Sequence, residues 1–72
     1  MKIELAHVPA YVDTREVRAI FEQYGTVESI EIVQKPWGRE AVLQMPDHAG
    51  RVAVDALRGC GWQGRQIVLR VV

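Results

Sequence analysis

The sequence predicts an α+β domain with the element order β-α-β-β-α-β, in which two helices cover one face of a four-stranded antiparallel sheet. Three observations lead to this prediction. Two segments carry apolar residues at helical spacing, and four others alternate in polarity or are rich in β-branched residues. A Lys-Pro-Trp-Gly turn joins the two central strands. The chain has 72 residues, so residues 1–72 are expected to form a single domain.

The first strand and the first helix are predicted from alternation and capping. Apolar and polar residues alternate over residues 2–8, which is typical of a half-buried strand. Pro9 is expected to end this strand, because proline has no N–H to donate to a sheet. Asp13 is a typical N-cap residue, and an apolar stripe at helical spacing follows it until Gly25, which is expected to end the helix.

The central hairpin is predicted next. Residues 26–34 are rich in β-branched side chains and favour a strand. Residues 35–38 have the composition of a turn, with a proline that fixes one φ angle and a glycine that tolerates a positive one. Alternation resumes over residues 39–45, so the two strands are expected to pair antiparallel.

The second helix and the last strand complete the predicted fold. The helix is expected to begin at a cap formed by Asp47, and residues 66–72 are expected to form the last strand. Right-handed crossovers place both helices on the same face of the sheet, which is the ferredoxin-like arrangement, and leave the other face open for binding. The inner stripe of the second helix is expected to contain Ala49, Val52, Ala53, Ala56 and Leu57.

Composition and motif content exclude several classes of function. Apolar residues make up 49% and charged residues 25% of the chain, as in ordinary globular domains. No apolar stretch approaches the roughly 20 residues of a membrane span, and no signal peptide is present, so we expect a cytoplasmic domain without a membrane partner. One cysteine, two histidines and no nucleophile–base or phosphate-loop pattern predict no metal, no cofactor and no enzyme activity.

A pattern of scaffold residues extends over the whole chain. It includes Phe21 and the Tyr-Gly-Thr-Val segment at 24–27, where the first helix is followed by the second strand. In the second half it includes Ala53, Ala56, Leu57, Gly59, Gly64, Arg65, Ile67, Leu69 and Val71. This pattern resembles an RNA recognition motif (RRM). The resemblance implies an RRM-like domain that binds single-stranded RNA or DNA.

The two RNA-reading motifs of that family fall on residues 3–8 and 38–45. The family usually presents base-stacking aromatic rings at the positions of Glu4, Glu40 and Val42, and none of these carries a ring. Each stacked base contributes about 1–3 kcal/mol, so we expect weak or non-standard RNA binding that uses loops and sheet edges. The candidate RNA-binding residues are Lys2, Glu4, His7, Lys35, Trp37, Arg39, Glu40, Val42 and Arg70.

The alternative prediction is a protein–protein interaction module. The open face is expected to carry a stripe of valines. This stripe would dock a protein partner or a second copy of the chain. Alternatively, the valines would be exposed residues that favour strand formation and bind nothing. Nine Lys and Arg residues balance nine Asp and Glu residues, so the net charge is zero and attraction to a polyanion is expected to be weak. The stripe consists of Val33, Val42, Val68 and Val72.

Three loop or strand-end residues have two interpretations each. The ring of Trp37 would either fold back over the hairpin or contact a base or peptide. His7 would either hydrogen-bond a base or satisfy nearby backbone groups. Trp62 is expected to cover the end of the second helix, with a surface contact as the alternative.

Overall fold

The computed structural model describes residues 1–62 and 65–72. For Trp62, Arg65 and Gln66 it describes the backbone and not the side chain, so the predicted role of the Trp62 ring lies outside the described part. The main sheet contains β1 (Lys2–Ala6), β2 (Ser29–Lys35), β3 (Gly38–Gln44) and β6 (Val68–Val71), in the antiparallel order β2-β3-β1-β6. Two short strands, β4 (Gly61–Trp62) and β5 (Arg65–Gln66), pair with each other before β6.

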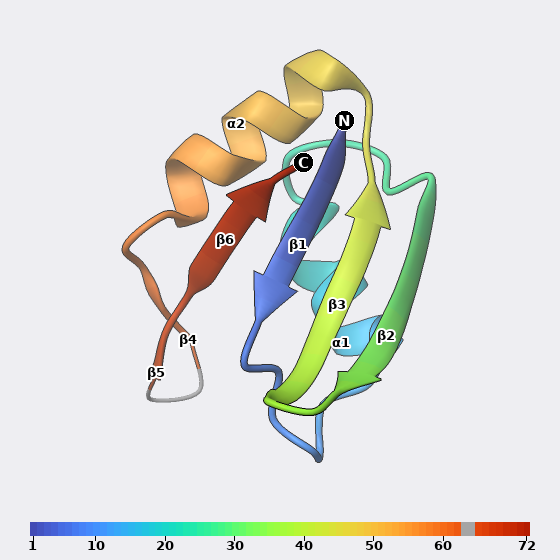
Figure 1. Cartoon of the computed structure of the whole chain (residues 1–72). Coiled ribbons are helices and arrows are strands. Elements are labelled where there is room, and N and C mark those ends of the chain that lie inside the picture. Colours follow the sequence, from blue (N-terminus) through green and yellow to red (C-terminus); the bar gives the residue numbers. More distant parts are fainter. Residues whose placement is uncertain (63–64) are drawn as a thin grey trace.

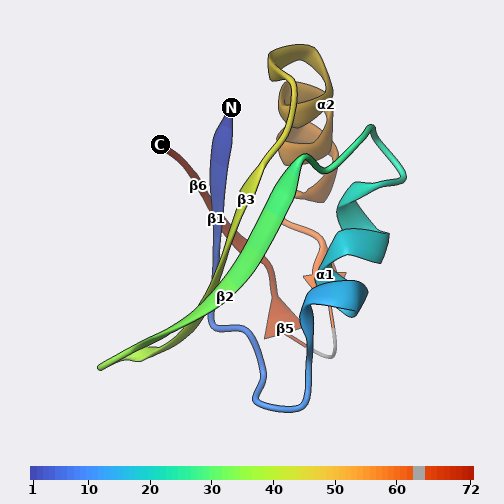
Figure 2. The ribbon, with the colours of Figure 1, turned by 90° about the vertical axis from the view of Figure 1, so that its right-hand side faces the viewer.

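Helices α1 (Thr14–Phe21) and α2 (Asp47–Leu57) lie on the same side of the sheet. Figure 1 shows the four long strands in front of the helices, and the edge-on view in Figure 2 shows the opposite face of the sheet uncovered. The predicted ferredoxin-like α+β architecture is therefore confirmed. Neither helix in the described chain combines the length and the apolarity that crossing a bilayer requires.

Strand β1 ends at Ala6, two residues before its predicted end. The cause is His7, whose φ angle of 60° lies in the left-handed region and interrupts the extended backbone. The strand therefore ends before His7 rather than at Pro9, and Pro9 begins the next turn, where its carbonyl accepts the N–H of Val12 at 3.1 Å. The N–H of Val8 then donates to the carbonyl of Arg39 at 3.0 Å, which ties the loop after β1 to the start of β3.

Helix α1 has the predicted cap, but it ends earlier than Gly25. The carboxylate of Asp13 accepts the N–H of Glu16 at 3.1 Å, and the last helical residue is Phe21. Gly25 instead serves the packing of the loop before β2, because a Cβ at this position would lie 2.4 Å from the Cβ of Ala49 in α2. Strand β2 accordingly begins at Ser29 and not at residue 26.

The predicted cap of α2 is wrong, and its predicted inner stripe is right for Ala49, Ala53 and Leu57 but wrong for Val52 and Ala56. Asp47 makes no capping hydrogen bond and lies 3.1 Å from the N-terminal amine of the chain. Val52 and Ala56 are exposed, because the helix turns a neighbouring stripe toward the sheet. A Cβ at Gly50 would lie 2.6 Å from the sulfur of Met1, so glycine allows this close approach. The buried residues of α2 are Gly50, Ala53, Val54 and Leu57.

The core fills the space between the helices and the inner face of the sheet. Alternate residues of β1 and β3, which include Ile3, Leu5 and Leu43, are at most 1% exposed, and they pack with Val17 and Phe21 of α1. The intervening residues of the same strands point to the open face, as the alternation predicted. This face is where the candidate functional residues gather.

Candidate functional site

The strand register aligns four of the open-face residues in one row across the sheet. Glu31 of β2 is opposite Val42 of β3, Val42 is opposite Glu4 of β1, and Glu4 is opposite Arg70 of β6. Residues directly opposite each other in an antiparallel pair share a face. The row therefore places two carboxylates, a valine and a guanidinium across the middle of the open face.

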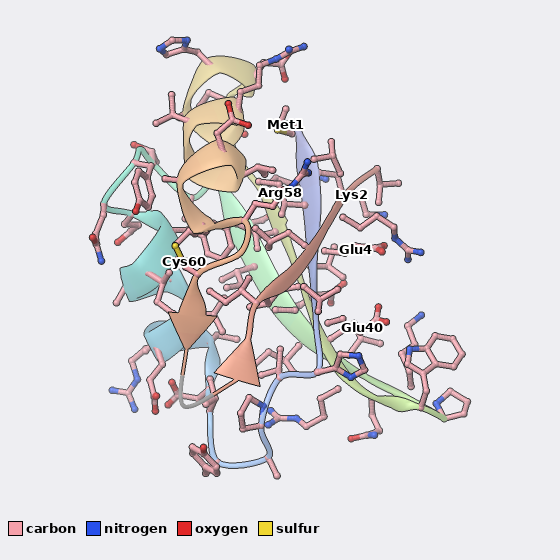
Figure 3. All side chains as sticks on the ribbon, turned by 90° about the vertical axis from the view of Figure 1, so that its left-hand side faces the viewer. Met1, Lys2, Glu4, Glu40, Arg58 and Cys60 are labelled. Carbon is pink, nitrogen blue, oxygen red and sulfur yellow. The ribbon has the colours of Figure 1, made fainter. Side chains whose placement is uncertain are left out.

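The neighbouring row carries a third carboxylate, that of Glu40 on β3, the strand that pairs with β1. Val33 is opposite Glu40, and Ala6 is opposite Val68. Figure 3 shows Glu4 and Glu40 on the side of the sheet that faces away from the helices. Glu4, Glu40 and Val42, which the sequence resemblance predicts at base-stacking positions, thus lie on the open face.

Glu4 and Arg70 form an ion pair between β1 and β6. Both Nε of Arg70, at 2.9 Å, and its Nη2 donate to Oε1 of Glu4. The hydrogen bond from Arg70 holds the pKa of the Glu4 carboxyl below its ordinary value, and the same bond raises the pKa of Arg70. Much of the charge of Arg70 is therefore already compensated within the sheet.

Trp37 of the hairpin turn and Glu40 of β3 form a second side-chain contact on the open face. The indole Nε1–H of Trp37 donates to Oε2 of Glu40 at 2.7 Å. Glu40 is only 7% exposed, whereas Trp37 is 65% exposed at the hairpin turn. The Nζ atom of Lys35 lies 5.9 Å from the centre of the Trp37 ring, within the range of a cation–π contact. The ring folds back onto β3, as one interpretation expected, and still presents much of its surface to solvent.

These contacts border a shallow depression on the open face, which we call the Glu4–Glu40 depression. Its volume is about 210 Å³. It brings together side chains from β1, β3, β6 and the hairpin turn, with a ring at one end and a guanidinium at the other. The lining residues are Glu4, Ala6, Trp37, Glu40, Val68 and Arg70.

Other predicted site residues lie elsewhere. Nη1 of Arg39 donates to the carbonyl of Pro9 at 2.5 Å, so this side chain braces the loop after β1 and does not line the depression. Lys2 and Val42 border a separate shallow depression near the start of β2. His7 is exposed and has the left-handed backbone that histidine tolerates better than most residues. Sequence reasoning missed this backbone role.

The four valines of the alternative interface do not form one continuous stripe. Val33 and Val42 lie on β2 and β3, whereas Val68 lies on β6 and Val72 follows it. Strand β1 runs between the two pairs and carries Glu4. The apolar surface is therefore divided by a charged row, and only the second pair is prominently exposed, at 48% and 64%.

The same arrangement of strands and helices occurs in solved structures. No protein-family model matches the sequence, and comparison with curated proteins finds no match. The crystal structure of RNA Binding Protein PG1 is similar with a TM-score of 0.85 and 23% identity, over 97% of this chain and 90% of that one. The RRM domain of S. pombe Puf1 has a TM-score of 0.85 and 17% identity, over 100% and 96% of the two chains.

A third similar structure is that of the Nab3-RRM, described by its recognition of a cis element of non-polyadenylated RNAs. It has a TM-score of 0.84 and 19% identity, and the match covers 99% of this chain and 92% of that one. These similarities, together with the strand order β2-β3-β1-β6, show that the chain has the RRM fold.

Proposed function

We propose that this chain binds single-stranded RNA on its open sheet face, with Trp37 as the base-stacking residue. The fold supports the proposal, because the similar structures are described as RNA-binding proteins or RRM domains. The observation that carries it is the position of Trp37: an indole that is 65% exposed, fixed by Glu40, at the rim of the Glu4–Glu40 depression. A base can stack on such a ring without sequence preference.

Stacking from a turn replaces stacking from the strands in this proposal. The aromatic positions of the family pattern hold Glu4, Glu40 and Val42, so the strands supply no ring. One ring contributes about 1–3 kcal/mol per stacked base, which predicts modest affinity. The ammonium group of Lys35 beside the ring is the nearest phosphate partner, whereas the carboxylates repel the backbone from the centre of the sheet.

The test is an NMR titration of the ¹⁵N-labelled chain with a single-stranded RNA hexamer at low salt. We expect the indole N–H resonance of Trp37 to shift. Trp37→Ala should weaken binding about 5- to 150-fold, because the stacking contribution is lost. Tyr11→Ala is the matched control, since it removes another ring, 68% exposed, from the loop after β1, and it should bind normally.

Two results would contradict this function. Unchanged affinity of Trp37→Ala would remove the stacking residue from the proposal. Absence of any shift with RNA, together with concentration-dependent broadening at Val68 and Val72, would support the protein-interaction or self-association alternative, which these two exposed side chains favour. A DNA hexamer of the same sequence tests whether the 2′-hydroxyl contributes. A cytoplasmic location stays a prediction from composition.

A further inference from the structure

The carboxylates of the Glu4–Glu40 depression each use one oxygen internally. Glu40 accepts the Trp37 N–H at Oε2, and Glu4 accepts the Arg70 guanidinium at Oε1. Within the described part of the chain, no donor reaches Oε1 of Glu40 or Oε2 of Glu4. The depression therefore presents unused hydrogen-bond acceptors beside an exposed indole ring.

An ionised carboxylate accepts hydrogen bonds and donates none, and this restricts which base it can pair with. The Watson–Crick edge of guanine offers two adjacent donors, N1–H and the N2 amino group, which match two carboxylate oxygens as a guanidinium does. Adenine and cytosine each set one amino donor beside a ring nitrogen that would repel the carboxylate. Uracil offers a single N–H between two carbonyl oxygens. Guanine is the one standard base whose edge fits.

Glu40 is the carboxylate placed to read such an edge. It belongs to a central strand, it is 7% exposed, and its hydrogen bond to Trp37 fixes the side chain at 2.7 Å from the ring that would stack the base. A fixed acceptor discriminates between donors better than a mobile one, because it does not adapt to the wrong edge. Glu31 lies on the same face but outside the depression.

We propose that the Glu4–Glu40 depression is a guanine-selective base site, in which the base stacks on Trp37 and donates N1–H and N2–H to the two oxygens of the Glu40 carboxylate. Oε1 of Glu40 is unused in the described chain, and Oε2 has a second lone pair besides the one that accepts the Trp37 N–H. This inference rests on the proposed RNA-binding function. The inference adds a preference for guanine to that function, because stacking on the Trp37 ring alone favours no particular base.

The first test compares the hexamers UUUGUU, UUUAUU, UUUCUU and UUUUUU by the Trp37 indole N–H shift. We expect the guanine hexamer to bind about tenfold more tightly or better than the other three, as for a bidentate base contact. Inosine in place of guanine keeps N1–H and lacks the amino group, so its affinity should fall about fivefold. The 7-deazaguanine hexamer keeps the whole Watson–Crick edge and should bind like guanine.

The second test uses Glu40→Gln, in which an amide presents one donor and one acceptor. The guanine preference should shrink to less than about threefold, because the amide NH₂ then faces a guanine donor. Glu31→Gln removes the same charge from the same face and should keep the full preference. The amide oxygen of Glu40→Gln can still accept the Trp37 N–H, and the wild-type inosine comparison remains valid if this variant does not fold.

The outcomes separate the two proposals. Equal affinity for the four hexamers, or a guanine preference that survives in Glu40→Gln, would overturn the guanine site and leave RNA binding intact. No response to any hexamer would overturn the RNA-binding function and this inference with it.

The peptide acetyl-Gly-Arg-Gly-amide is titrated in parallel, because a guanidinium also carries paired donors. A shift with this peptide and none with RNA would assign the depression to a protein partner and overturn both proposals.

Discussion

The Glu4 carboxylate couples the electrostatics of the open face to pH. Its pKa lies below the ordinary value of 4.5 because Arg70 donates to it. A carboxyl group whose pKa is lower in the folded state stabilises the fold at pH values above its unfolded pKa. This contribution is lost as the pH falls through the lowered, folded-state pKa.

We predict that Arg70→Gln returns the pKa of Glu4 toward its ordinary value. The measurement is an NMR titration of the side-chain carboxyl carbon of Glu4 in both proteins. The wild type should also unfold at a higher temperature than Arg70→Gln at pH 7, and this difference should shrink as the pH falls below 4.5. A Glu4 pKa that is the same in both proteins would mean that the ion pair does not persist in solution.

Alternation in the sequence predicted which residues share the open face, but not what they bond to. The register confirms the placement of Glu4, Glu40 and Val42, because a period of two residues fixes the face of each strand position. The hydrogen bond from Trp37 to Glu40 and that from Arg39 to Pro9 depend on side-chain conformations and on the path of the loop after β1. Neither has a sequence period to reveal it.

The sequence predicted that the hairpin and the two helices exist. It predicted less well where the helices end and which of their faces is buried. The turn between Lys35 and Gly38 lies where its composition indicated. In α2, two neighbouring stripes contain Ala53 and Leu57, and each adds a valine, Val52 or Val54, so hydrophobicity alone does not choose between them. The packing of Met1 against Gly50 accompanies the choice of the second stripe. The last strand, predicted over residues 66–72, is divided in the structure into β5 (Arg65–Gln66) and β6 (Val68–Val71). This division and strand β4 were not predicted, because a strand of two residues shows no alternation.

The orientation of α2 predicts unequal effects of two identical substitutions. Val54→Ala should lower the free energy of unfolding by about 1–3 kcal/mol, because Val54 is 4% exposed and the removal of its methyl groups leaves a cavity in the core. Val52→Ala should change it by less than about 0.5 kcal/mol, since Val52 is 42% exposed. Both changes alter helix propensity equally, so each is the control for the other. Urea denaturation measures both, and the reverse order would indicate the stripe that the sequence predicted.

At the scale of the whole molecule, charge is balanced but unevenly placed. The chain carries nine basic and nine acidic residues, and the open face holds Glu4, Glu31 and Glu40 against few cations. Arg70 is paired with Glu4, which leaves Lys2 and Lys35 as the cations of this face with no ion pair in the described chain. Under the proposed function, RNA on this face would therefore gain affinity from base contacts more than from its phosphates.

This distribution predicts a weak dependence of RNA affinity on salt. Each phosphate neutralised on a single strand contributes about −0.7 to the slope of log K against log salt, so contacts from Lys2 and Lys35 give a slope of about −1.4. The measurement is the dissociation constant of the guanine hexamer over a series of salt concentrations. Lys35→Gln should bring the slope about 0.7 closer to zero, whereas Arg51→Gln on the opposite side should leave it unchanged. A slope of about −4 or steeper would require phosphate contacts from several more cations. RNA would then have to reach beyond the open face toward the arginines of the helical side.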